Sequence, residues 1–246
     1  MNVFKKIKRF ASKPPFLFLG LALFTSASFA APQPKVTGAE NLTPGYVSLL
    51  LDYSHVQQQM RSAITQGQQQ QWRNWMDTGL KKNETLYWWL LADWLATTGK
   101  NEEAYKALVQ ALVFMKVEMS TCGGGSSQGT EFIEGMLKRY GYIITAKHQQ
   151  TTIKSAVLEA VTRTENQLNR GQILSGMSCH ALEVARAQKG RSQTIRLTPP
   201  STEQRAFQRK LEQQRNALRG IKEDMAYGKM WDSSDTKVLW NLQEIK

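Results

Sequence analysis

The sequence is poor in the residues and motifs that most often carry enzyme chemistry. Its three histidines, His55, His148 and His180, are far apart and match no H-E-x-x-H or comparable metal-binding spacing. The G-x-S-x-G, phosphate-loop and dinucleotide-binding motifs are also missing. We therefore predict a protein that is not an enzyme, with no catalytic residue, no metal site and no cofactor.

The sequence also lacks a long apolar run after its first thirty residues. A transmembrane helix needs about 20 consecutive apolar residues, and no later segment reaches that length. We therefore expect the mature chain to have no transmembrane segment.

The first thirty residues have the pattern of a secretory signal peptide. A basic start is formed by Lys5, Lys6, Lys8, Arg9 and Lys13. An apolar run over residues 16–24 follows, and Ser28-Phe29-Ala30 supplies the small-x-small pattern of a cleavage site. We expect cleavage near Ala30 and a mature protein that is periplasmic or secreted. The alternative is an uncleaved membrane anchor.

Only two cysteines are present, Cys122 and Cys179. In an exported chain, an even pair of cysteines most simply forms one disulfide. The alternative is a reactive thiol. However, Cys122 stands before three glycines and Cys179 before His180, and neither context matches a known nucleophile signature. We therefore predict a Cys122–Cys179 disulfide.

Apolar residues recur at helical spacing through most of the chain, and no segment shows sustained alternation of the strand type. The predicted fold class is all-α, with stacked antiparallel helical hairpins and a long C-terminal helix. The expected organisation is a signal peptide (1–30), a flexible arm (31–43), a helical-hairpin domain (44–187), a basic linker (188–200), and a C-terminal helix with an apolar tail (201–246).

One hairpin, residues 86–116, resembles a tetratricopeptide repeat. The family pattern is W-x2-L-G-x2-Y on the first helix and A-x3-F on the second, followed by a proline. The matching positions are Trp88, Leu91, Ala92 and Leu95 on the first helix, Gly99 at the turn, and Ala104, Leu108 and Ala111 on the second helix. The departures are Ala92 for Gly, Leu95 for Tyr, Leu108 for Phe and Lys116 for Pro.

The resemblance covers one hairpin, and no second copy stands at an offset of about 34 residues. Because a single repeat cannot bury its apolar face alone, the segments 44–80 and 131–169 are expected to flank it as degenerate hairpins. The resemblance implies a scaffold that binds a peptide or protein and has no chemistry of its own. The alternative is an unrelated helical hairpin with a tight glycine turn.

The first helix of this hairpin is unusually rich in aromatic residues. Tyr87, Trp89 and Trp94 cannot all point in the direction of Trp88 on one helix. Core packing is the simpler explanation for them. The alternative interpretation makes Trp89 and Trp94 candidates for contact with a protein partner.

Basic residues outnumber acidic ones ten to two between residues 186 and 222. The last helix carries an apolar stripe that is interrupted by one glutamine: Phe207, Leu211, Gln214, Leu218, Ile221 and Met225. This stripe could either associate with a second copy of the helix or pack on the helical body. The candidate partner-binding residues are Arg205, Arg209, Lys210, Arg215, Arg219 and Lys222. A helix face with this charge attracts anionic surfaces. The alternative interpretation is an ordinary solvated helix face with no binding role. Aromatic residues that could stack on bases are not interleaved with these charges, which disfavours nucleic acid.

The sequence therefore predicts an exported, non-catalytic adaptor or assembly protein of the bacterial cell envelope. Its helical body would bind a protein partner, and its basic helix an acidic partner or an anionic envelope surface. One alternative is an accessory component of an envelope-spanning secretion or conjugative DNA-transfer machine. Another is a peptidoglycan-binding or peptidoglycan-cleaving protein, with Glu131, Glu134 or Glu159 as the acid.

Overall fold

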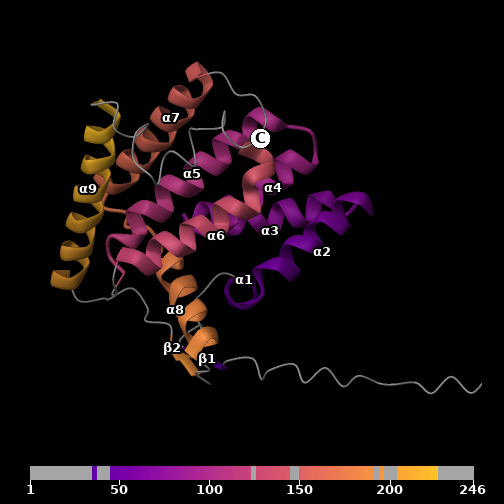
Figure 1. The fold of residues 1–246 in the computed structure, drawn as a ribbon, viewed down its shortest axis with the longest axis horizontal. Coiled ribbons are helices and arrows are strands. Elements are labelled where there is room, and N and C mark those ends of the chain that lie inside the picture. Colours follow the sequence, from indigo (N-terminus) through magenta and orange to yellow (C-terminus); the bar gives the residue numbers. More distant parts are fainter. Residues whose placement is uncertain are drawn as a thin grey trace, which may run out of the picture. The chain divides into compact units, whose positions relative to one another are not determined.

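Helices make up nearly all of the described secondary structure, which confirms the all-α fold class (Figure 1). The computed structural model describes residues 35–37, 45–122, 126–144, 150–190, 194–196 and 204–226. The helices are α1 (Tyr46–Leu51), α2 (Tyr53–Thr65), α3 (Gln69–Lys81), α4 (Thr85–Thr97), α5 (Asn101–Met119), α6 (Ser126–Ile144), α7 (Gln150–Asn169), α8 (Met177–Gly190) and α9 (Gln204–Ala226). The predicted signal peptide, most of the predicted arm and linker, and the apolar tail after Ala226 lie outside the described residues.

The hairpin of α4 and α5 forms the centre of the helical body. Ten consecutive residues of α4, from Thr85 to Trp94, are buried, and a helix that is apolar on all sides belongs in a core. Helices α2, α3, α5, α6 and α8 surround α4, while α5 also contacts α7 and α9. The turn between them uses Gly99 at φ 79°, where the Lys100 N–H donates to the Leu95 carbonyl over 2.8 Å.

The residues that carry the resemblance to a tetratricopeptide repeat lie along the interior of this hairpin. Trp88, Leu91, Ala92, Ala104, Leu108 and Ala111 are buried, and Leu95 is half-buried against the core. Small side chains at the crossing let the two helices approach closely. Helices α6 and α7, which cover most of the segment expected to form a flanking hairpin, both pack on α5.

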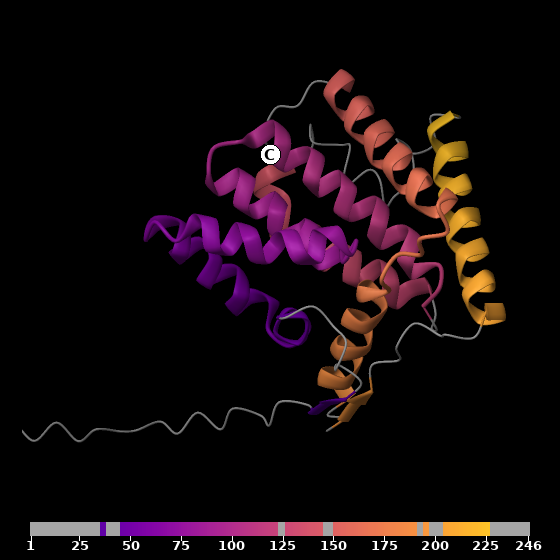
Figure 2. The same ribbon diagram turned by 180° about the vertical axis from the view of Figure 1, so that it is seen from behind.

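A short parallel sheet joins two segments that we expected to be irregular. Strand β1 (Lys35–Thr37) comes from the predicted flexible arm, and strand β2 (Thr194–Arg196) comes from the predicted basic linker. They pair in register, with Val36 opposite Ile195, and Figure 2 shows them at the far end of α8. Three-residue strands are too short to show alternation, and their hydrogen-bond partners lie far apart in sequence. The sequence therefore did not predict that the arm and the linker pair through β1 and β2, which only the structure shows.

Two helical glycines provide a matched test of the packing. A Cβ on Gly79 in α3 would overlap with the buried ring of Tyr87, whereas a Cβ on Gly135 in α6 meets no atom within 4 Å. Gly135→Ala should raise the free energy of unfolding by about 1 kcal/mol through helix propensity. Gly79→Ala should lower it by about 1–3 kcal/mol through overpacking.

Urea unfolding of both variants and the parent chain measures the two effects. Because the substitution is the same, the difference between the variants isolates the overlap with Tyr87. Equal stabilisation by both substitutions would show that α3 and α4 are further apart than described.

Candidate functional site

Helix α9 is docked on the body by its apolar stripe. Leu211, Gln214, Leu218 and Ile221 are buried, and α9 contacts α5 and α7 (Figure 1). The glutamine in the stripe has a partner, because its Oε1 accepts the Leu174 N–H over 2.9 Å. The stripe is therefore covered within this chain, and the opposite side of α9 faces outward. The side chain of Met225, the last stripe residue, lies outside those described.

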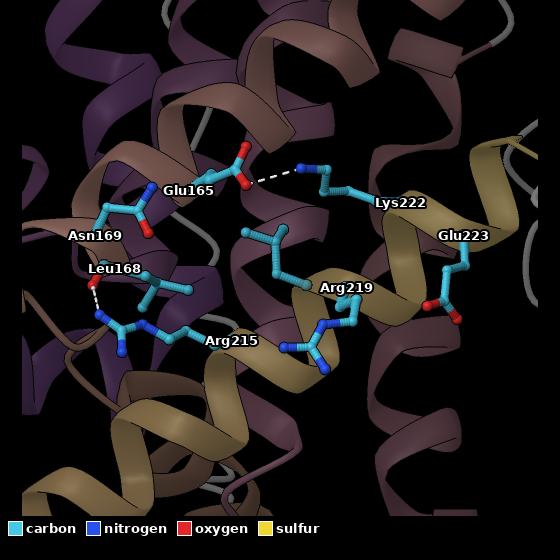
Figure 3. Close-up of a pocket in the computed structure, with 8 residues that line it drawn as sticks. Glu165, Leu168, Asn169, Arg215, Arg219, Lys222 and Glu223 are labelled. Carbon is cyan, nitrogen blue, oxygen red and sulfur yellow. Dashed lines mark hydrogen bonds and ion pairs between the residues drawn. The ribbon is translucent and has the colours of Figure 1, made fainter.

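A groove of about 450 Å³ runs between α7 and α9 (Figure 3). It is lined by Glu165, Leu168, Asn169, Arg215, Leu218, Arg219, Lys222 and Glu223. The groove thus brings three of the six predicted partner-binding residues to one place, Arg215, Arg219 and Lys222.

Two of these three cations hold α9 against α7. Lys222 Nζ forms an ion pair with Glu165 Oε1 at 2.8 Å. Arg215 Nη2 donates to the Leu168 carbonyl over 2.9 Å. This carbonyl belongs to the last turn of α7 and also accepts the Gly171 N–H over 3.1 Å. Arg215 is therefore its second donor, and it places a cation at the negative end of the helix dipole. Arg215 and Lys222 therefore have structural roles.

The remaining basic residues of α9 have a different environment. Arg205, Arg209 and Arg219 are exposed, and no hydrogen bond or ion pair joins them to any other residue in the described part of the chain. Figure 3 draws no hydrogen bond or ion pair to the Arg219 guanidinium. Lys210 is half-buried and extends toward the backbone of Gly176. We call Arg205, Arg209 and Arg219 the exposed arginines of α9.

The structure contradicts the partner-contact interpretation of Trp89 and Trp94. Their side chains are 0% and 8% exposed, and the Trp89 ring packs on Tyr140 with centroids 5.0 Å apart. The reason is that helices cover α4 on all sides, so both tryptophans fill the core. Trp88, on the same helix, is covered by the guanidinium of Arg163 at 5.1 Å from its ring centroid.

The predicted disulfide between Cys122 and Cys179 is confirmed. It joins Cys122, three residues after the end of α5 at Met119, to Cys179 in the first turn of α8. No free cysteine remains, so the reactive-thiol alternative does not apply to this state of the protein.

A buried glutamate next to the disulfide was not recognised from the sequence. Glu118 is fully buried. Its Oε1 accepts the Gly176 N–H over 2.9 Å and the Ser175 hydroxyl over 3.1 Å, and its Oε2 accepts the Ser178 N–H over 2.9 Å. A side chain of α5 thereby caps the N-terminus of α8 and places a carboxylate at the positive end of its dipole.

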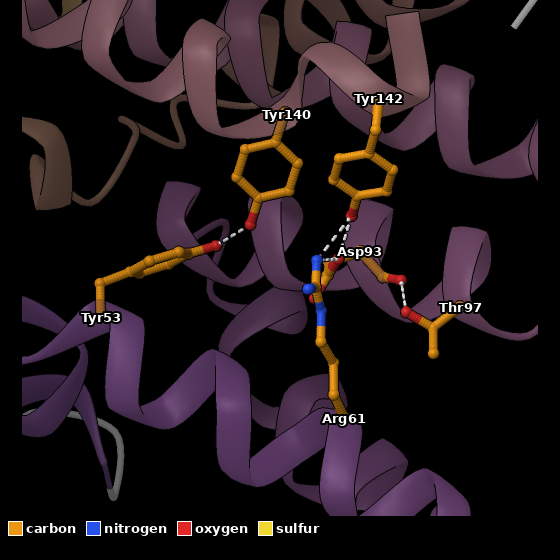
Figure 4. A network of polar contacts seen from close by, with 6 residues as sticks. All are labelled: Tyr53, Arg61, Asp93, Thr97, Tyr140 and Tyr142. Carbon is orange, nitrogen blue, oxygen red and sulfur yellow. Dashed lines mark hydrogen bonds and ion pairs between the residues drawn. The ribbon is translucent and has the colours of Figure 1, made fainter.

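A second buried carboxylate, Asp93, organises a polar network between α2, α4 and α6 (Figure 4). Asp93 is 0% exposed, while its partner Arg61 has 45% of its side chain in solvent. Arg61 Nε donates to Oδ2 over 2.8 Å and Nη2 to Oδ1 over 2.5 Å, and the Tyr142 hydroxyl donates to the same Oδ1. Burial, and then the hydrogen bond to Asp93, raise the pKa of the Tyr142 hydroxyl, which therefore stays a donor.

Of the glutamates considered for a cell-wall-cleaving enzyme, the two whose side chains are described lie on different helices. Glu134 is exposed on α6, and Glu159 on α7 pairs with Arg163 at 3.2 Å. The side chain of Glu131 lies outside those described. Within the described residues, no three His, Cys, Asp or Glu side chains come together in a group that could hold a metal ion.

None of the described helices is long and apolar enough to cross a membrane. The chain matches no protein-family model, no curated protein and no solved structure. Its function must therefore be inferred from the positions of its own residues, of which the exposed arginines of α9 are the clearest candidates for binding.

Proposed function

We propose that the mature chain is a non-catalytic adaptor or assembly protein of the bacterial cell envelope, periplasmic or secreted, which binds an acidic segment of a partner protein through α9. The observation that carries the proposal is the environment of the exposed arginines. They stand on a helix whose other side is fixed to the body, and they have no carboxylate partner in the described part of the chain.

The chemistry of these residues suits an acidic protein. A guanidinium presents its donors in a planar fork that matches a carboxylate bidentately. Because α9 is already ordered by Leu211, Leu218 and Ile221, little conformational entropy remains to be lost on binding. The cations that hold α9 in place, Arg215 and Lys222, are separate from those offered to the partner.

Export is supported by the signal-peptide pattern of residues 1–30 and by the disulfide, which persists in oxidising compartments. The α4–α5 hairpin supports the finer interpretation as a tetratricopeptide-like scaffold, since its tight Gly99 turn and buried alanines allow the close helix packing of such repeats. In that interpretation the helical body supplies a further surface for a protein.

The test is an affinity pull-down from native envelope extract with the mature protein, at low and moderate salt. The triple substitution of Arg205, Arg209 and Arg219 by alanine should weaken capture of the partner about tenfold or more, because three carboxylate contacts are lost. The matched control replaces Lys81, Lys82 and Lys154, three exposed cations that are not on α9, by alanine. The control changes the net charge equally and should retain the partner.

Thermal unfolding of both triple variants establishes that they are folded. Undiminished capture by the α9 variant would refute the proposal. If the parent protein recovered only anionic lipid or peptidoglycan, and both triple variants lost this binding equally, the binding would be a general effect of charge. It would then not indicate a site for a protein. Co-purification of a membrane secretion or DNA-transfer complex would identify the partner's class.

A further inference from the structure

A pocket of about 240 Å³ is lined by residues of α1, α2, α4, α6 and α8. Most of its wall is apolar and is formed by Leu49, Leu50, Leu86, Phe132, Met136 and Val184. All of these except Phe132 are buried, so the wall belongs to the core and close packing fixes its shape. An engineered apolar cavity of about 150 Å³ binds benzene. This pocket therefore has room for a branched or aromatic side chain.

Two opposite charges also line the pocket, Asp52 and Arg139. Both residues are exposed, so their charged groups lie where the pocket meets solvent. No ion pair joins them to each other or to any other residue in the described part of the chain. The pocket thus combines an apolar wall with one anion and one cation that the fold leaves unpaired.

Each of the two charges is held in place by a contact that leaves it able to bind. Arg139 Nη1 donates to the Ser54 hydroxyl over 2.8 Å, and the guanidinium lies over the Tyr53 ring, 5.3 Å from its centroid. Ser54 takes one of the five N–H donors of a guanidinium. Asp52 Oδ1 accepts the His55 N–H over 3.1 Å at the start of α2, and a carboxylate has further acceptor sites. Groups that are already oriented lose less conformational entropy when a ligand binds.

These groups define the chemistry of a matching ligand. A guanidinium binds a carboxylate bidentately, an aspartate accepts from an ammonium group, and the wall takes an apolar group. A fatty acid or an amine would leave one of the two protein charges desolvated without a partner, which is costly. The terminal residue of a protein also carries only one of the two charges. Drug-sized ligands occupy pockets of about 300–1,000 Å³, so a smaller molecule fits here.

We propose that this pocket binds a free α-amino acid with an apolar side chain, of the size of leucine, methionine or phenylalanine. Arg139 binds the carboxylate of the ligand, Asp52 binds its ammonium group, and its side chain lies against Leu50, Leu86 and Met136. The site goes beyond the proposed function and is independent of it, because no residue of α9 lines the pocket.

The test is isothermal titration of the mature protein with L-leucine, L-methionine, L-phenylalanine and glycine. At least one of the three apolar amino acids should bind with a Kd below about 1 mM. Glycine should bind about tenfold more weakly or worse, because it has no side chain to bury. If none of the three apolar amino acids bound below that Kd, the proposal would be overturned.

Analogues of the best ligand test the two charges separately. For leucine, 4-methylpentanoate lacks the ammonium group and 3-methylbutylamine lacks the carboxylate. Each should bind about tenfold more weakly or worse, because one charge of the pocket then stays unpaired. Binding of 4-methylpentanoate as tight as that of leucine would refute an amino-acid site and assign the pocket to apolar carboxylates.

Substitutions at the mouth of the pocket locate the ligand. Arg139→Gln and Asp52→Asn should each weaken binding about tenfold or more. Asparagine keeps an oxygen that can cap α2, so the second substitution tests the charge. The matched controls are Lys138→Gln and Glu134→Gln, exposed residues of α6 that do not line the pocket. Equal losses in Arg139→Gln and Lys138→Gln would show a general effect of charge and contradict the proposal.

A last variant fills the pocket. Ala185 is half-buried on α8 and lines the pocket, and Ala185→Leu keeps a residue that favours helix. It should abolish binding, and thermal unfolding establishes that the variant is folded. Unchanged binding by this variant would place the ligand elsewhere. The triple substitution of the exposed arginines of α9 should bind the amino acid as the parent does, so failure at one site does not imply failure at the other.

Discussion

Replacing Cys122 and Cys179 by serine will lower the free energy of unfolding by about 4 kcal/mol. The disulfide closes a loop with a sequence separation of 57 residues, and in the chain-entropy model a crosslink of this span removes that much freedom from the unfolded chain. The loop contains α6 and α7, which both pack on α5. Without the crosslink, the ends of α5 and α8 are joined only by non-covalent contacts.

Urea unfolding of the oxidised protein, the reduced protein and the double serine variant measures this loss. The reduced protein and the variant should agree within about 1 kcal/mol, because both lack the same constraint. A single control, Ser175→Ala, should cost less, about 1–2 kcal/mol. It removes the hydrogen bond of the Ser175 hydroxyl to Glu118 and the one that the Met177 N–H donates to this hydroxyl. If the serine variant were as stable as the oxidised protein, the hydrogen bonds of Glu118 would be sufficient to hold α8.

The features that the sequence predicted well are those that depend on local spacing or simple counting. The apolar stripe of α9 recurs at helical spacing, so the helix and its apolar face could be predicted from Leu211, Leu218 and Ile221. The sequence did not decide between self-association of this stripe and packing on the body. The disulfide followed from a single pair of cysteines in a chain that begins with a signal-peptide pattern. The glycine turn of the central hairpin was likewise visible, since Gly99 separates two helical patterns.

The periodicity of α4 could not decide between the core-packing and partner-contact interpretations of Trp89 and Trp94, for a physical reason. Periodicity indicates the buried face of a helix only when another face is polar. In α4 ten consecutive residues are buried, so the pattern has no polar side from which to assign directions. Tyr142, which is exposed, stands on α6. The residues near it in the sequence, Lys138 and Arg139, gave no reason to predict that this tyrosine is exposed.

The two buried carboxylates were missed because their partners are distant in sequence. Asp93 is bound by Arg61 and Tyr142, which are separated from it by 32 and 49 residues. Glu118 accepts from residues up to 60 positions away. In the sequence, each carboxylate looks like an ordinary polar position on a helix. Only the tertiary structure shows that these groups are buried and must be satisfied by hydrogen bonds.

Glu118→Ala is the second substitution expected to have a large effect, with a loss of about 4 kcal/mol in the free energy of unfolding. It leaves the N–H groups of Gly176 and Ser178 without acceptors at a buried helix N-terminus. Each unsatisfied buried donor costs about 1–3 kcal/mol. The loss of a negative charge at the α8 dipole adds about 0.3–1 kcal/mol.

Glu118→Gln distinguishes the hydrogen bonds from the charge. The amide keeps one acceptor oxygen but presents an N–H₂ group to a second donor, so about half of the loss, roughly 2 kcal/mol, should remain. The control is Glu102→Ala in the first turn of α5, where an exposed carboxylate stands 3.8 Å from Lys106. Its surface ion pair and its position at the helix dipole should together contribute less than about 1 kcal/mol. Urea unfolding and amide hydrogen exchange in α8 provide the measurements. If α8 exchanged no faster in Glu118→Ala than in Glu102→Ala, the disulfide alone would fix the start of α8, and Glu118 would have no role as its cap.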